Sequence, residues 1–141
     1  MSQDVVGAIV SILSADSGVS ALVGARVYGD EIAPDEIHNQ PRAAVVVQPS
    51  GGAVPTFTQG TIPLEAMRVD VLCYGSTRYD ADRLRRAVYD SLRAVQRRTE
   101  GSVLVHWINL AGGLATGRDP DTGWPRAFQS WQVLADTRPA A

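Results

Sequence analysis

Eleven residues near the middle of the chain alternate in character, and this alternation restricts the possible folds more than any other feature of the sequence. Successive side chains of a strand point to opposite faces of its sheet. From Leu64 to Tyr74, one face would carry Met67, Val69, Val71 and Cys73. The other face would carry Ala66, Arg68, Asp70, Leu72 and Tyr74. The segment is therefore predicted to be a strand that lays one face on a hydrophobic core.

An amphipathic helix is predicted directly after this strand. Gly75-Ser76-Thr77 breaks the strand, and Thr77 with Asp80 three residues later resembles a capping box. One helix face would carry Ala81, Leu84, Val88, Leu92 and Val95. We expect the helix to be about 30 Å long. We expect it to end with Arg97-Arg98 in its last turn and Gly101 beyond, which suits the helix dipole and the C-terminal glycine rule.

The N-terminal part favours a helix followed by a short strand. Apolar residues recur at helical spacing from Asp4 to Leu13, and the helix is expected to start near Ser2. Asp16-Ser17-Gly18 resembles a turn, and Val19 to Val23 form a further helical turn closed by Gly24. Arg26 to Tyr28 is a candidate strand. Gly29 to Pro41 is a polar, proline-containing connection.

The next segments predict a buried strand and a long loop. Ala43 to Val47 is a continuous apolar run, typical of a strand that is buried on both faces. Pro49-Ser50-Gly51-Gly52 is predicted to end it. The stretch from Gly52 to Gly60 mixes Gly, Pro and Thr with Val54 and Phe57, so we expect a long loop or a mobile hairpin. The loop from Pro49 to Pro63 should be poorly ordered in the isolated subunit.

Two further strands are predicted in the C-terminal third, from Val103 to Leu110 and from Ala127 to Ala135. Gly112-Gly113 and Asp119 to Gly123 would form a turn-rich connection between them. The chain is thus predicted to be a single α+β domain over residues 1–141. Its mixed or antiparallel sheet would carry two main helices packed on one face.

Cysteine content and the N-terminus indicate the compartment. The single cysteine cannot form an intramolecular disulfide. The N-terminus lacks the basic region of a signal peptide, and no apolar stretch reaches the roughly 20 residues of a membrane span. We therefore expect a protein of the cytoplasm without a membrane partner.

The sequence predicts no catalytic, cofactor-binding or metal-binding residues. His38 lies near Asp30, Glu31, Asp35 and Glu36, but without a second His or a Cys at zinc spacing this segment is best interpreted as an acidic surface loop. No glycine-rich phosphate loop and no nucleophile elbow occur. Asp119 and Asp121 flank Pro120, and turn chemistry explains them.

Cys73 has two possible roles. It shares a face with Val69 and Val71, which favours an inert core thiol. A reactive thiol would need His106 and an orienting residue to converge on it.

Arginines along the predicted second helix form the remaining feature. All thirteen basic residues of the chain are arginine, which is typical of a GC-rich genome and also of interfaces. Asp82 is placed to pair with Arg86 at i, i+4. We interpret this face first as a solvated one; an intersubunit or DNA-facing surface is the alternative.

Several local patterns together resemble the tail terminator, or tail completion, proteins of long-tailed phages. The first is Leu22-Val23-Gly24-Ala25-Arg26-Val27-Tyr28-Gly29 after an N-terminal helix. The second is Gln40-Pro41-Arg42-Ala43-Ala44-Val45-Val46-Val47, which opens a buried strand. The third is Arg68-Val69-Asp70-Val71-Leu72-Cys73-Tyr74-Gly75 before a helix that starts at Thr77. The closing strand also fits, so the resemblance covers nearly the whole chain, although its motifs are short and structural.

The resemblance implies a virion structural protein at the head-proximal end of the tail, assembled in the host cytoplasm. Members form a hexameric ring on the last ring of tail tube protein, stop tube growth and provide the surface for joining the head connector or stopper. Viral DNA passes through the lumen without sequence-specific binding. The family has no enzymatic residues and no cofactor. The polar, acidic segment from Gly29 to Pro41 departs from the family pattern.

Two alternatives stay open: another phage neck protein, such as a head-tail connector or stopper, and a small ligand-binding domain or enzyme. Two surfaces are predicted for the terminator. Val54, Phe57 and Thr58 are candidates for a partner-binding loop. The loop from Pro49 to Pro63 should become ordered against a neighbour or the tail tube. Arg83 and Arg86 are candidates for the intersubunit surface, where they would face acidic residues of the next copy. Those acidic residues are Asp30, Glu31, Asp35 and Glu36.

Overall fold

The computed structural model describes residues 5–29, 41–53, 64–120 and 122–136. In chain order these form α1 (Val5–Ala15), α2 (Ser17–Val23), β1 (Val27–Gly29), β2 (Ala44–Ala53), β3 (Leu64–Tyr74), α4 (Arg78–Arg93), β4 (Gln96–Glu100), β5 (Val103–Arg118) and β6 (Pro125–Asp136). The predicted strand from Leu64 to Tyr74 has the bounds of β3.

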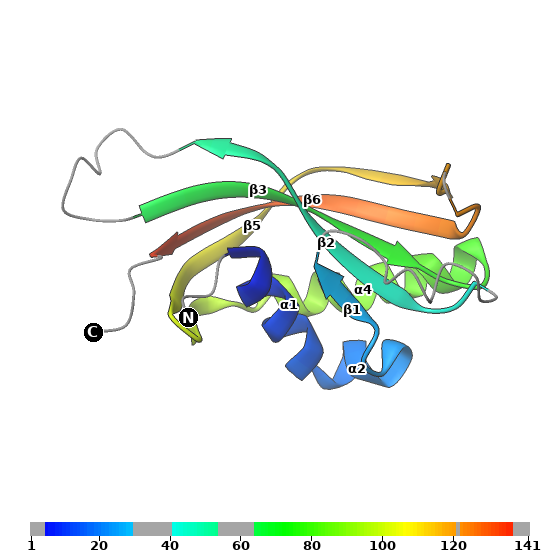
Figure 1. Ribbon diagram of the computed structural model, residues 1–141, viewed down its shortest axis with the longest axis horizontal. Coiled ribbons are helices and arrows are strands. Elements are labelled where there is room, and N and C mark those ends of the chain that lie inside the picture. The colour runs from blue at the N-terminus through cyan, green and yellow to red at the C-terminus, as the bar shows by residue number, and fades with distance from the viewer. Residues whose placement is uncertain (1–4, 30–40, 54–63, 121, 137–141) are drawn as a thin grey trace.

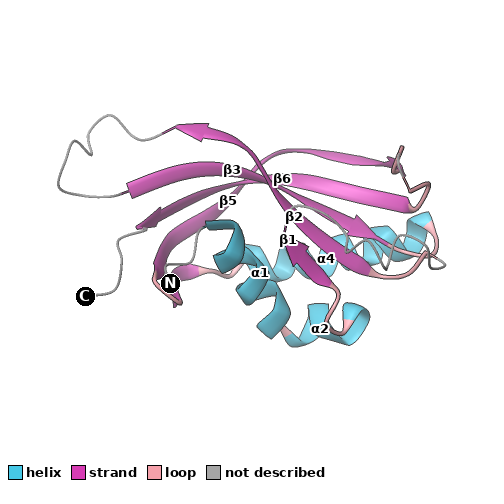
Figure 2. Ribbon diagram, viewed as in Figure 1, coloured by secondary structure: helices cyan, strands magenta, loops and turns pink. Residues whose placement is uncertain are grey.

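The six described strands form one curved sheet in the order β1-β2-β3-β6-β5-β4. The β1–β2 pair is parallel and the other pairs are antiparallel, so the sheet is mixed. Helices α1, α2 and α4 lie on one side of it (Figures 1 and 2). The predicted α+β class and the packing of the two main helices, α1 and α4, on one face are confirmed. Helix α2 is a short third helix at the predicted helical turn.

The alternation in β3 divides its side chains between two hydrophobic clusters, one on each face of the sheet. Val69, Val71 and Cys73 lie in the main core under the helices. Leu72 and Tyr74 lie in a smaller cluster on the other face. Strand β2 does the same with Val45 and Val47 against Ala44 and Val46, which confirms burial on both faces.

Helices α1 and α4 complete the main core with large aliphatic side chains. Those of Ile9, Ile12, Leu84 and Leu92 are fully buried. Burial of each such side chain contributes about 1.5–3 kcal/mol to stability relative to exposure. Periodic apolar residues therefore hold both helices on the sheet.

The start of α4 has the predicted cap and requires a glycine. The Thr77 side chain accepts a hydrogen bond from the backbone N–H of Asp80 at 3.1 Å. The Asp80 carboxylate accepts from Ser76 instead of returning to the cap, so the capping box is half formed. A Cβ at Gly75 would lie 2.6 Å from the backbone nitrogen of Ala81, so only glycine allows α4 to approach the end of β3 this closely.

The predicted end of the second helix is wrong. Helix α4 stops at Arg93 and is capped by Ala94. Gln96–Glu100 forms edge strand β4, which pairs antiparallel with β5 across a tight turn that contains Gly101. The cross-strand hydrogen bonds of this hairpin replace the last helical turns, and Arg97, with φ of 43°, has left-handed backbone geometry that a helix excludes.

Two predicted strand ends are also wrong, because the strands pass through residues that usually break them. Strand β2 continues through Pro49 to Ala53, with a register shift between Pro49 and Gly51. The pairing of β2 with β1 ends at Val47, so β2 has no partner on that side at Pro49 within the described residues. Proline is tolerated in such an edge segment and at a bulge. Strand β5 continues through Gly112, whose φ is 140°, with register shifts on both sides of it. The predicted turn from Asp119 to Gly123 does connect β5 to β6.

Candidate interaction surface

Helix α4 presents an exposed stripe of side chains to solvent. They recur every three or four residues, so they share one side of the helix. The stripe consists of Tyr79, Arg83, Arg86, Asp90 and Arg93. Tyr79 is 76% exposed, the largest exposure among the big hydrophobic side chains of the described residues. An exposed aromatic ring among arginines is the composition typical of protein interfaces.

Ion pairs within α4 neutralise part of this stripe. The predicted Asp82–Arg86 pair is confirmed at 3.1 Å between Asp82 Oδ2 and Arg86 Nε. Asp82 also accepts from Arg85 at 2.8 Å, and Arg85 Nη1 donates to Gln129 Oε1 of β6 at 3.2 Å. Arg85 thus ties the helix to the sheet. The exposed Arg86 pair contributes only a few tenths of a kcal/mol, about the value for such helix pairs, so its guanidinium can rearrange toward a partner.

Arg83 lies apart from these pairs. Within the described residues it makes no ion pair, and it lines a small recess of about 190 Å³ between α2, the start of β2 and α4. Leu22, Ala43 and Leu84 line the same recess, with Asp80 beside them. Of the two predicted intersubunit arginines, Arg83 therefore borders an apolar hollow, whereas Arg86 lies on the open helix surface.

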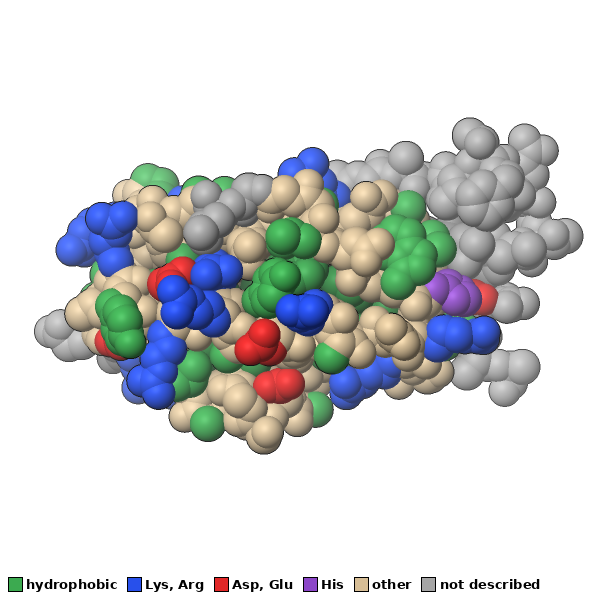
Figure 3. Space-filling model, turned by 180° about the vertical axis from the view of Figure 1, so that it is seen from behind, with side chains coloured by type: hydrophobic (Ala, Val, Ile, Leu, Met, Phe, Trp, Pro, Cys, Tyr) green, Lys and Arg blue, Asp and Glu red, His purple; other side chains and the backbone are tan. Residues whose placement is uncertain are grey.

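A second exposed apolar position occurs where α4 meets β5. The Arg93 guanidinium carbon lies 5.5 Å from the centre of the Tyr89 ring, and the Tyr89 ring lies 5.7 Å from the ring of buried Trp131. Leu110 is the register partner of Trp131, so both side chains lie on the helix side of the sheet. Leu110 is 47% exposed. Figure 3 shows the molecule from behind, with hydrophobic side chains near the middle of that surface and basic side chains beside them and toward one end.

The sequence does not predict this seam of Tyr89, Arg93 and Leu110, and the reason is physical. Leu110 was predicted only as the end of a strand, and Trp131 is 21 positions away in the sequence. The two meet through the β5–β6 ladder, whose register contains three irregularities. Tyr79, by contrast, could have been found in the sequence as an aromatic residue within a polar helix stripe.

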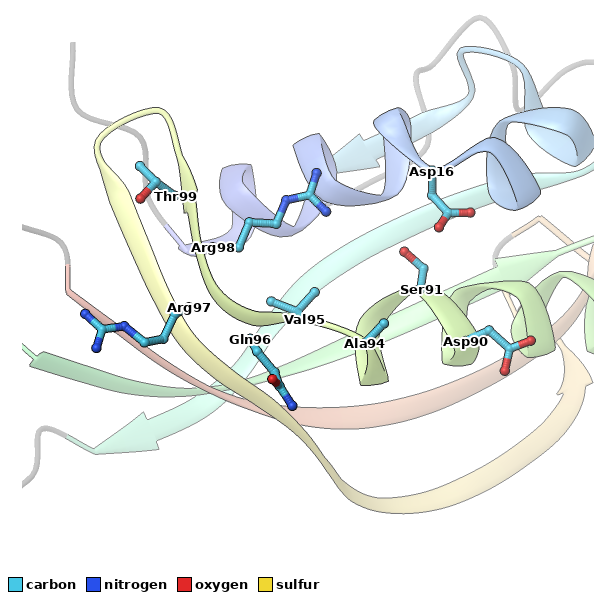
Figure 4. A pocket seen from close by; sticks show the side chains of 9 residues that line it. All are labelled: Asp16, Asp90, Ser91, Ala94, Val95, Gln96, Arg97, Arg98 and Thr99. Atoms are coloured by element: carbon cyan, nitrogen blue, oxygen red, sulfur yellow. The ribbon is translucent and has the colours of Figure 1, made fainter.

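An open groove of about 540 Å³ follows the end of α4 and edge strand β4 (Figure 4). Asp16 and Ser91 line opposite walls, and the side chains of Arg97 and Arg98 leave β4 in different directions. Asp16 already caps α2 by accepting the N–H of Val19 at 3.0 Å, and Arg98 pairs with Glu100 at 2.6 Å. The groove is polar and open, and two of its charged groups, Asp16 and Arg98, already have partners in the structure.

A side-chain network closes the end of the sheet where β5 turns into β6. The Tyr74 hydroxyl donates to Asp119 Oδ2 at 2.7 Å, and Arg126 Nη1 lies 3.6 Å from the same oxygen. Burial, followed by the hydrogen bond to Asp119, raises the pKa of Tyr74 far above its usual range. The Tyr74 ring packs edge-on against Trp124 at 6.1 Å. These contacts fix a turn and present no open site.

Cys73 and His106 do not form a catalytic pair. Cys73 faces Ala127 across one ladder, and Ala127 faces Thr116 across the next. Ten residues of β5 separate Thr116 from His106, roughly 30 Å of strand. Cys73 is 1% exposed, and burial raises the pKa of its thiol to about 12, so the predicted core role is confirmed.

Within the described residues, no group of three or more His, Cys, Asp and Glu side chains could hold a metal ion. No single helix of this part of the chain is long and apolar enough to cross a membrane, and α1 with α2 would reach that length only as a pair bent by 85°.

The other predicted site residues lie outside the described residues. These are Asp30, Glu31, Asp35 and Glu36 of the acidic segment, with His38, and Val54, Phe57 and Thr58 of the candidate loop. The part of the loop before them, to Ala53, is strand β2, so the expectation of a loop from Pro49 onward is wrong there.

Comparison with known proteins identifies a shared fold. No protein-family model matches the sequence, and no curated protein matches it. A chain in the solved virion of a native gene transfer agent (GTA) particle has a similar structure, with a TM-score of 0.68 and 16% sequence identity. The match covers 94% of each chain. The two chains therefore share a fold over nearly their whole length.

Proposed function

We propose that this chain is a structural protein of a phage-like virion. The observation that supports the proposal best is the similarity, over 94% of both chains, to a chain of a gene transfer agent virion. The sequence patterns that resemble tail terminator proteins point to the same kind of particle. A structural role also agrees with the site: the Cys73 thiol is buried, and Asp119 and Asp16 have structural hydrogen bonds.

Within such a particle, we propose the role of tail terminator. Identical subunits in a head-to-tail arrangement close into a ring when the rotation between neighbours divides the circle, and a ring can cap a tube of the same symmetry. The ring would have six subunits, sit on the last ring of tail tube protein, end elongation and offer its other side to the head-tail connector or stopper. Viral DNA would pass through its lumen without sequence-specific contacts.

Two groups of residues would make the contacts. Arg83 and Arg86, exposed on α4, would meet acidic residues of the segment 30–36 in the next copy, because such charge complementarity fixes orientation. The segment that contains Val54, Phe57 and Thr58 would contact the tail tube protein or a neighbouring subunit. It follows β2 in the chain, and a partner would cover its apolar side chains.

Deletion of the gene from the phage or phage-like element that encodes it would test the role, with electron microscopy of the particles. A tail terminator predicts tubes of uncontrolled length and heads without tails, both restored by the wild-type gene. Tails of normal length that fail to join heads would favour a connector or stopper instead. Normal particles that lack the chain would exclude a virion role and favour a ligand-binding domain or enzyme.

A further inference from the structure

The surface where α4 meets β5 has the arrangement of an interface centre with a charged border. Its apolar part consists of Leu110 and the partly exposed Tyr89, beside fully buried Trp131. The Arg93 guanidinium lies over the Tyr89 ring. Exposed Arg86 comes three residues before Tyr89 in α4, so it is a neighbour on the helix surface. Aromatic residues and arginine are enriched among the side chains that contribute most to binding, and they cluster near interface centres.

Packing holds the apolar part in place. The Tyr89 ring is fixed between the Arg93 guanidinium, 5.5 Å away, and the Trp131 ring, 5.7 Å away. The Trp131 indole N–H has no hydrogen-bond partner among the described residues, so this ring is positioned by packing alone. A rigid aromatic surface loses little conformational entropy when a partner covers it.

The segment that carries the arginines of this surface differs in net charge from the rest of the chain. Residues 78–100, which form α4 and β4, contain seven arginines and four carboxylates, a net charge of +3. The remaining residues contain six arginines and eleven carboxylates, a net charge of −5. Complementary charge is thus present within one chain, on different segments, as a head-to-tail contact between two copies requires.

We infer that the seam of Tyr89, Arg93 and Leu110 is the centre of a contact with a second copy of this chain, and that Arg86 lies at its border. The inference rests on the proposed function and makes it more specific. It moves the energetic centre of the subunit interface from Arg83 and Arg86 to the junction of α4 with β5. A border arginine then contributes mainly to orientation and association rate, and the apolar centre contributes most of the affinity.

A photoreactive amino acid in place of Leu110 tests the inference in assembled particles. After irradiation, we expect a product with the mass of two copies of this chain, and mass spectrometry should map the crosslink to a different segment of the second copy. Crosslinks only to another virion protein, or no crosslink although the chain is in the particle, would overturn the inference and leave the proposed function intact. Absence of the chain from particles would overturn both.

Charge reversal offers an independent test with a matched control. Arg93→Glu should reduce incorporation into particles about tenfold or more, the effect expected when one important interface side chain is lost. Arg97→Glu makes the same charge change at an exposed residue of β4, outside the seam, and should leave incorporation within about twofold. Urea unfolding would establish that both variants fold. Equal incorporation of the two folded variants would exclude the seam from the interface.

Discussion

Cys73 permits a quantitative test of the core because its side chain is both buried and ionisable. It lies in β3 between Leu72 and Tyr74 and is 1% exposed. Burial raises the pKa of the thiol from 9.0 to about 12, Arg85 lowers it and Asp82 raises it further. We predict that Cys73→Ala lowers stability at pH 7 and removes part of the stability loss at alkaline pH.

The pKa difference sets the direction of the pH effect. Below pH 9 the thiol is protonated in both states, so the stability linked to it is fully present. Between pH 9 and about 12 the unfolded chain loses the thiol proton while the folded protein keeps it. The free energy of unfolding of the wild type should therefore fall by up to about 1.4 kcal/mol per pH unit, on the order of 4 kcal/mol across the window.

The two proteins should consequently cross in stability. Removal of the buried sulfur costs roughly 1–2 kcal/mol at pH 7 through lost packing. The wild type loses a similar amount through thiol ionisation in its unfolded state by roughly pH 10 to 10.5. The stability curves should meet near that pH. The other ionisable groups are common to both proteins, so their effect cancels in the difference.

Urea unfolding of the reduced proteins at several pH values from 7 to 10.5 measures this difference. Cys73→Val is a matched control because it removes the titrating group and keeps most of the volume. It should abolish the extra alkaline loss at a smaller cost at pH 7. Parallel curves for wild type and Cys73→Ala would refute the reasoning, since the thiol would then ionise equally in both states. Rapid reaction of the folded protein with a thiol reagent at pH 8 would contradict the core role.

Three further substitutions test the contacts that shape the fold, each by urea unfolding at pH 7. Gly75→Ala should destabilise by about 1–3 kcal/mol, because its Cβ would lie 2.6 Å from the backbone nitrogen of Ala81; wild-type stability would show that α4 can shift freely. Tyr74→Phe should cost about 1–2 kcal/mol through loss of the bond to Asp119, and no change would mean that the bond is weak in solution. Thr77→Ala should cost about 1 kcal/mol by removing the helix cap, whereas Thr77→Ser should keep most of the stability, and equal losses in the two variants would argue against capping.

Local pattern alone determined much of this protein. The alternation of β3 and the apolar spacing of α4 were readable because each periodicity is contained in one segment and reports which side chains face a core. The start of α4 was readable for the same reason, since the Thr77 cap needs only residues three positions apart. The α+β class follows from these elements, and so does burial of Cys73.

Tertiary structure decided where elements end and which surfaces form. Gln96–Glu100 has helix-compatible arginines, yet it pairs with β5 because the neighbouring strand can form hydrogen bonds with its backbone N–H and C=O groups. Pro49 and Gly112 remain within strands because bulges at these positions accommodate them in ladders with distant partners. The contact of Tyr89 with Trp131, and the position of Leu110 beside it, depend on the register between segments about 20 residues apart or more. Local periodicity carries no information about that register, because any partner strand of suitable pattern could supply the same hydrogen bonds.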